Sequence, residues 1–184
     1  MGIRCLILAF LVLAAVPAPA AFLTGQDVAR FNAHVTRLQS AMDAVHRAMD
    51  DRAPDDLRDA LESFRSTLLS ARSDYSRLRD VIASRTDRLY DQNKSYGDPP
   101  HWPAAQAEKL SRYQQEAADI TTAEDNCHFL ADQTNEDLST LHHTREEGVD
   151  PLAESYDLYD TRIRELNERF GTYQSQLAAL RRWL

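Results

Sequence analysis

The chain has 184 residues, 43% of them hydrophobic, and its 29 acidic and 21 basic residues give a formal net charge of −8 at pH 7. This acidic balance disfavours a nucleic-acid partner, because a duplex-binding surface needs a basic field that releases counterions from phosphates. The length suits one domain and is short for two ordinary ones.

The first twenty residues have the features of a secretory signal peptide. Arg4 precedes an uncharged apolar run over 5–16, and the small residues Ala18-Pro19-Ala20 follow. An uncleaved membrane anchor is the alternative, but Pro17 and Pro19 argue against it because proline breaks a helix interior. We expect cleavage near Ala20-Ala21 and export to the periplasm or the extracellular space. Only Arg4 is lost, so 20 basic and 29 acidic residues remain, a net charge of −9.

After the signal, apolar residues recur at alternating spacings of three and four in four stretches, which is the pattern of a heptad repeat. We call the apolar edge of each stretch its seam. The seams predict helices over about 25–50, 54–93, 102–147 and 151–184, in a single domain over 21–184 with no further membrane span. The last seam is the most regular; it consists of Leu152, Tyr156, Tyr159, Ile163, Leu166, Phe170, Tyr173, Leu177, Leu180 and Leu184.

Proline and glycine mark the three breaks between these helices. Pro54 suits the first turn of the second helix, 96–100 is a dense turn signal, and Gly148 with Pro151 stops one helix and starts the next. Such short connections favour antiparallel neighbours. The sequence therefore predicts an all-α fold: an antiparallel up-down-up-down four-helix bundle, or elongated helical hairpins with coiled-coil seams.

The third helix is the least regular of the four. Its seam is clear to Ile120 and polar in the middle, through Glu124, Cys127, Ala131 and Thr134. A kink, or a seam that drifts onto Ala123 and Leu130, is the expected cause. Cys127 is the only cysteine after the signal, so no disulfide framework is available, and a buried thiol is the expectation.

Two carboxylate–histidine pairs could in principle hold a metal ion. Asp43 lies three residues before His46, and Asp125 three before His128, which places each pair on one helix face and loosely resembles the motif of di-iron helical bundles. That family uses glutamates that point to the bundle axis, whereas these histidines flank the seam. The expectation is therefore no cofactor, with a metal- or ligand-binding bundle as the alternative.

An enzymatic role finds no support in the motifs of the chain. No Gly-x-Ser-x-Gly elbow, glycine-rich phosphate loop or His-Glu-x-x-His run is present, and only 5 glycines are available for tight loops. The strongest local signal is electrostatic: a row of arginines at a spacing of seven, one position after seam residues of the second helix, consisting of Arg58, Arg65, Arg72 and Arg79. Such flanking positions carry interhelical salt bridges in coiled coils.

Two interpretations of the arginine row stay open. Either the arginines pair internally, with Glu116, Asp137 or Asp160 as candidate partners, or they dock a partner protein. The chain as a whole is similar in length, export and helicity to periplasmic chaperones and minor components of secretion or pilus systems, without a shared motif. We therefore expect an exported, non-enzymatic protein–protein interaction module: a coiled-coil scaffold, an assembly factor or a holdase chaperone. Its partner could be another protein or, in a homo-oligomer, a second copy of the chain.

Overall fold

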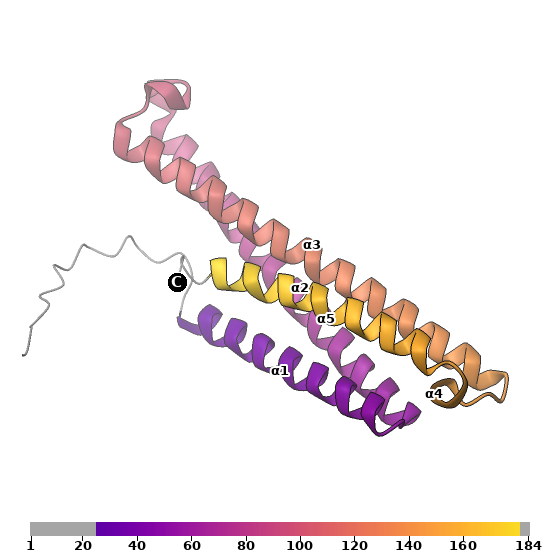
Figure 1. Cartoon of the computed structure of the whole chain (residues 1–184). Helices are drawn as coiled ribbons and strands as arrows, with labels where there is room; N and C mark the ends of the chain where they lie inside the picture. The colour runs from indigo at the N-terminus through magenta and orange to yellow at the C-terminus, as the bar shows by residue number, and fades with distance from the viewer. Residues whose placement is uncertain (1–24, 181–184) are drawn as a thin grey trace, which may run out of the picture.

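The computed structural model describes residues 25–180, which are all-helical and contain no strand (Figure 1). The expected signal peptide at 1–20 and its cleavage position lie outside these residues. The helices are α1 (Gly25–Asp50), α2 (Pro54–Asn93), α3 (Ala104–Glu146), α4 (Pro151–Glu154) and α5 (Tyr156–Leu180), with two short 3₁₀ turns, η1 (Lys94–Tyr96) and η2 (Pro99–His101), between α2 and α3. No helix in this range combines the length and the apolar character that crossing a bilayer requires.

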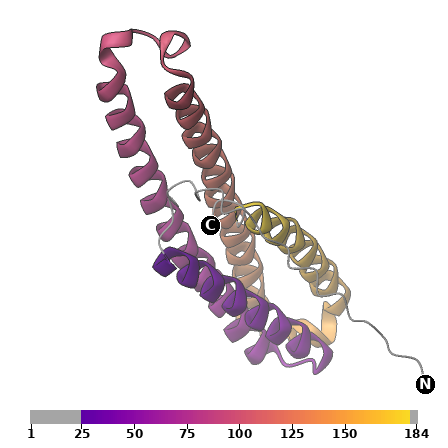
Figure 2. The same ribbon diagram turned by 90° about the vertical axis from the view of Figure 1, so that its left-hand side faces the viewer.

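The longest helices, α2 and α3, form a hairpin against which the others pack. Helix α1 lies along α2, α5 lies along α3, and α5 also touches α1. Because α1 and α5 are shorter, they cover one half of the hairpin, and the other half of α2 and α3 projects beyond them (Figures 1 and 2). We call the covered half the base and the turn over 94–103 the tip.

Apolar seams form the core of the base. Aromatic residues make much of it: the rings of Phe64 and Phe170 meet edge to face with centroids 5.3 Å apart, and Phe31 lies 4.8 Å from Tyr75. Each fully buried aromatic or leucine side chain stabilises the fold by about 1.5–3 kcal/mol. Nearly every seam position of α2 is buried: Leu57, Leu61, Phe64, Leu68, Ala71, Tyr75, Leu78, Ile82 and Leu89.

Helix α3 buries a wider surface than a single seam, because it contacts both α2 and α5. Ala123 and Leu130 are buried together with Cys127, Ala131 and Thr134. The helix continues without interruption through this region. Its polar middle is thus the place where one helix faces two neighbours, and the buried polar atoms there have partners on those neighbours or on α3 itself.

The predicted continuous helix over 151–184 is wrong at its start. The chain forms the single turn α4, breaks at Ser155 and resumes as α5. Asp150 caps α4, its carboxylate accepting from the backbone N–H of Leu152 and Ala153 at 3.0 and 3.2 Å. Pro151 and Leu152 are both buried, so this turn covers the end of the base and the helix axis changes before α5.

A small separate core stabilises the tip. Leu89, Trp102 and Leu110 are buried against one another, and the Trp102 indole N–H donates to the carbonyl of Gly97 at 2.8 Å. Gly97 has φ +74°, a conformation that glycine adopts without a Cβ penalty. The buried residues of this cluster are distinct from those of the core of the base, and the half-buried Tyr113 of α3 packs against both.

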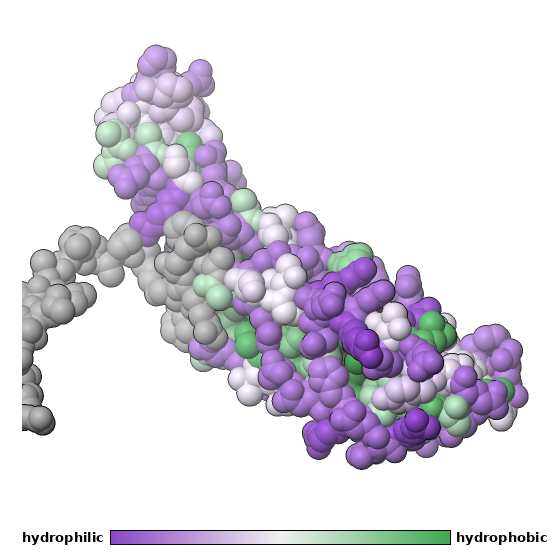
Figure 3. Space-filling view, viewed as in Figure 1, coloured by the Kyte–Doolittle hydropathy of each residue, from purple (hydrophilic) through white to green (hydrophobic). Residues whose placement is uncertain are grey.

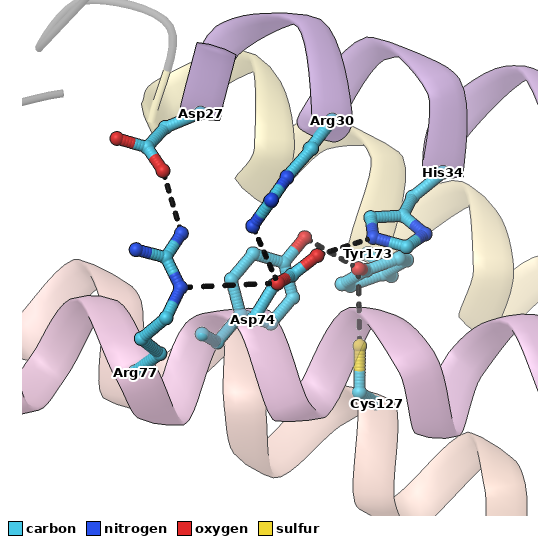
Figure 4. Close-up of polar contacts among 8 residues, drawn as sticks. Asp27, Arg30, His34, Asp74, Arg77, Cys127 and Tyr173 are labelled. Carbon is cyan, nitrogen blue, oxygen red and sulfur yellow. Dashed lines mark hydrogen bonds and ion pairs between the residues drawn. The ribbon is translucent and has the colours of Figure 1, made fainter. Parts of the chain in front are cut away.

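Polar contacts fasten α1 to α2 where the base meets the projecting hairpin (Figure 4). His34 Nε2 lies 2.9 Å from Asp74 Oδ2, and Arg77 Nη2 donates to Asp27 at 2.6 Å. Arg30 adds a longer contact of 3.6 Å to Asp74. His34 is buried while the two arginines are half exposed, so the histidine–aspartate contact is the one with little competition from water.

Candidate functional site: the arginine row on α2

The arginine row runs along the side of α2 that faces α3. A spacing of seven residues repeats the same helix face about every 10.5 Å. In the antiparallel hairpin the row therefore passes a series of α3 residues, from Glu124 opposite Arg79 to His142 and Glu146 opposite Arg58.

The two ends of the row are neutralised within the molecule. Arg58 contacts two carboxylates of its own helix, with Nη2 2.7 Å from Asp59 and Nη1 3.5 Å from Asp55. The hydrogen bond and the charge of Asp59 raise the pKa of the Arg58 guanidinium above its usual range. At the other end, Arg79 Nη1 donates to the nearly buried carboxylate of Glu124 at 2.7 Å, which is an interhelical pair.

The middle of the row has no carboxylate at ion-pair distance. Arg72 Nη1 lies 3.5 Å from His128 Nδ1, and Arg65 lines a surface groove between α2 and α3 whose other members include Glu62, Asn135 and Ser139. Within residues 25–180 neither Arg65 nor Arg72 forms an ion pair with a carboxylate. Both side chains are half buried, so their guanidinium groups have restricted freedom and unused hydrogen-bond donors.

The internal partners expected for the row are wrong. Glu116 pairs with Arg112 of its own helix at 3.4 Å, Asp137 with Arg162 at 2.8 Å, and Asp160 with Arg164. Glu116 and Asp137 lie on α3, where Glu116 is also close enough to Arg85 of α2 to feel its charge, and Asp160 is on α5. The carboxylate that does reach the row, Glu124, is a residue of the polar middle of α3.

The structure does not bring together the four residues considered for a metal. Asp43 accepts from Gln39 of its own helix at 3.0 Å, and His128 lies between Arg72 and Asp132, the latter at 3.4 Å. Asp125 is exposed and His46 is half buried. No group of three or more histidine, cysteine, aspartate or glutamate side chains within 25–180 has a geometry that could hold a metal ion.

Cys127 is a buried thiol, as expected. Its Sγ donates to the hydroxyl of Tyr173 at 3.1 Å, and that hydroxyl lies 2.8 Å from Tyr75 Oη (Figure 4). Burial raises the pKa of the Cys127 thiol to about 12. The thiolate, which is the nucleophilic form, is therefore negligible at neutral pH, and the chain of hydroxyls links α2, α3 and α5 structurally.

Sequence reasoning missed one surface feature. Phe129 and Leu158 are about half exposed, lie off the seams, and line a groove between α3 and α5. The signal was present in the sequence, because each is a large apolar residue at a non-seam position. Single exposed apolar residues are common on protein surfaces, and only the packing of α5 on α3 shows that these two share one groove.

Comparison with protein-family models, with curated proteins and with solved structures finds no match.

Proposed function

We propose that the protein is an exported, non-enzymatic interaction module that docks an acidic segment of a partner protein on the middle of the arginine row. In this proposal the long helices act as an up-down-up-down four-helix bundle with heptad seams, which holds the α2–α3 face rigid. The signal-like residues 1–20 support export, and a mature protein beginning at Ala21 in the periplasmic or extracellular fraction would test that part.

The observation that carries the proposal is the difference between the ends and the middle of one row. Arg58 and Arg79 have carboxylate partners, whereas in the described residues Arg72 contacts His128 and neither Arg65 nor Arg72 forms an ion pair. Four equivalent sequence positions thus have unequal environments. A row that served helix register alone would place a carboxylate opposite the middle arginines too, since unpaired charges contribute nothing to register.

The chemistry of guanidinium favours a carboxylate-rich partner. A planar guanidinium binds a carboxylate through two parallel hydrogen bonds, and such charge-assisted bonds are stronger than neutral ones. Arg65 and Arg72 lie about two helical turns apart, so an extended or helical acidic segment could reach both. The net negative charge of the whole chain makes this a local, short-range site that does not steer partners over long distances.

Charge reversal tests the proposal. We expect Arg65→Glu with Arg72→Glu to lower the affinity of the full chain for an oligo-glutamate peptide by about tenfold for each arginine, measured by fluorescence anisotropy. The melting temperature should not change, because no internal ion pair is lost. The matched control is Arg37→Glu with Arg88→Glu, which makes the same change of charge at two exposed positions outside the row.

Two outcomes would contradict docking at this site. An equal loss of affinity in the control would show that only net charge matters. A lower melting temperature in the Arg65 and Arg72 variant, with affinity unchanged, would show that these arginines stabilise the fold and do not bind a partner.

A further inference from the structure

A groove runs along the outer side of α3 and α5, on a different face of α3 from the arginine row. We call it the α3–α5 groove; the residues that matter in it are Phe129, Glu136 and Asp137 of α3 and Leu158, Glu165 and Arg169 of α5. The view in Figure 3 includes this side of the molecule, where separate apolar patches lie among hydrophilic residues over α3 and α5.

The two ends of the groove are apolar. Phe129 is 53% exposed and Leu158 48% exposed. The guanidinium of Arg169 lies 4.7 Å over the Phe129 ring, so Phe129 stands level with Arg169 of α5. Leu158 precedes Arg169 by eleven residues on the same helix, and the two apolar ends are therefore separated by about 16 Å, or three helical turns.

The centre of the groove is negatively charged. Asp137 is 1% exposed; its Oδ1 accepts from Arg162 at 2.8 Å, while its Oδ2, also buried, has no hydrogen-bond partner. Burial raises the pKa of the Asp137 carboxyl, Arg162 opposes that shift, and the charges of Glu136 and Glu165 add to it, which places both glutamates near this carboxyl. Within 25–180 neither glutamate forms an ion pair, so the one pair of Arg162 with Asp137 leaves both glutamate charges uncompensated.

Arg169 does not neutralise this centre. It lies over Phe129 and donates to the side-chain oxygen of Gln133 at 3.0 Å, at the Phe129 end of the groove. Glu136 and Glu165 are both exposed, so a partner can reach their carboxylates. The groove thus has two apolar contact points with excess negative charge between them.

We propose that the α3–α5 groove binds a basic amphipathic helix of a partner protein. Apolar side chains at positions i and i+11 of that helix contact Phe129 and Leu158, and arginine or lysine at i+4 and i+7 reaches the exposed carboxylates of Glu136 and Glu165. All four positions fall on one face of an α-helix, which is the geometry of helix-in-groove recognition. The negative centre selects against neutral and acidic segments.

The probe is a pair of labelled helical peptides that differ at two positions. Both carry leucine at i and i+11; one has arginine and the other glutamine at i+4 and i+7. With the full chain we expect the arginine peptide to bind about tenfold tighter by fluorescence anisotropy, and Glu136→Gln with Glu165→Gln to remove that difference. Phe129→Ala with Leu158→Ala should weaken both peptides.

The matched control is Glu62→Gln with Glu154→Gln, which removes two exposed carboxylates outside the groove and should leave both affinities unchanged. Circular dichroism melting of each variant checks that the fold is retained. Equal affinity for the two peptides, or an equal effect of the control, would overturn the proposal.

A second copy of this chain is the competing occupant. The exposed face of α2 that carries Arg65, Leu69 and Arg72 is basic and partly apolar, so it could enter the groove of another molecule. If Glu136→Gln with Glu165→Gln converted an oligomer to a monomer in light scattering, the partner-helix proposal would be wrong. Since Arg65 and Arg72 are not needed for peptide binding, failure here is distinguishable from failure of the docking site on α2.

Discussion

The buried hydroxyl and thiol groups of Tyr75, Cys127 and Tyr173 show how single residues tie three helices together. Each polar atom has its partner within the group, at 2.8 Å between the two hydroxyls and 3.1 Å from sulfur to oxygen. A buried polar group without a partner costs about 1–3 kcal/mol, so this arrangement allows polar atoms in the core without that loss. It also fixes which faces of α2, α3 and α5 meet.

These same groups predict a loss of stability in alkaline solution. Burial raises the pKa of Cys127 to about 12 from an ordinary 9.0, and it raises the pKa values of Tyr75 and Tyr173 well above 10.0. Above pH 9 the unfolded chain therefore loses protons that the folded protein retains, and the free energy of unfolding falls as pH rises through the interval from 9 towards 12.

We expect chemical denaturation between pH 8 and 11, the range in which these shifts act, to show this fall beginning near pH 9 in the native chain. In Cys127→Ala it should begin only near pH 10, where the tyrosines take over. A decline that is identical in the two proteins would show that Cys127 is not the group responsible.

At the scale of the element, polar contacts add to the apolar packing of α1 on α2. Near the first turns of α1, Phe31 packs against Tyr75, Asp27 pairs with Arg77, and His34 contacts Asp74. The half-exposed arginine pairs contribute about 0–1 kcal/mol each. The His34–Asp74 contact matters more, because His34 is buried and its Nδ1 has no partner, which leaves the Asp74 carboxylate as the only acceptor shown for the ring.

Replacing Asp74 should therefore loosen α1. We expect Asp74→Ala to lower the free energy of unfolding by about 1–3 kcal/mol, since the buried imidazole loses its partner. Amide hydrogen exchange should rise first in the amino-terminal half of α1. The control is Asp80→Ala, at an exposed position of α2, the helix that carries Asp74. A comparable loss of unfolding free energy in that variant would mean that the negative charge of α2, and not the contact with His34, stabilises α1.

At the scale of the whole molecule, the spacing of apolar residues predicted the fold class and most buried positions. It did so because apolar side chains at helical spacing share one helix face, and that face packs against other helices. The seam of α2 is buried over its length, and the helix over 54–93 has the predicted bounds. Two features were not predictable in this way. The break at Ser155 follows from the cap at Asp150 and from Leu152 covering the base, which are tertiary contacts.

The partners of the arginine row were also beyond the sequence pattern. Whether Arg79 meets Glu124 or Glu116 depends on the axial register of α3 against α2, because the two glutamates lie eight residues, or about two helical turns, apart. The groove of Phe129 and Leu158 likewise depends on where α5 lies along α3. Periodicity identifies faces, whereas candidate sites between helices require the register.

The division of the molecule into a base and a projecting hairpin predicts uneven local stability. Among the described residues, the core of the tip consists of Leu89, Trp102 and Leu110 with Ala107 and Tyr113 packed against it, and it includes no residue of α1 or α5. We expect Trp102→Ala to accelerate amide exchange over 86–110 by at least an order of magnitude, because losing a buried tryptophan costs about 3–5 kcal/mol where it is fully felt. Exchange in the base should change little.

Phe64→Ala is the matched comparison, since it removes an aromatic side chain of the main core that contacts Phe170. That change should accelerate exchange throughout the base and lower the melting temperature. If Trp102→Ala lowered protection in the base as much as at the tip, the two cores would unfold as one cooperative unit. If the loss of protection is confined to the tip, the projecting half can open while the base stays folded. The arginine row and the α3–α5 groove would then remain able to bind.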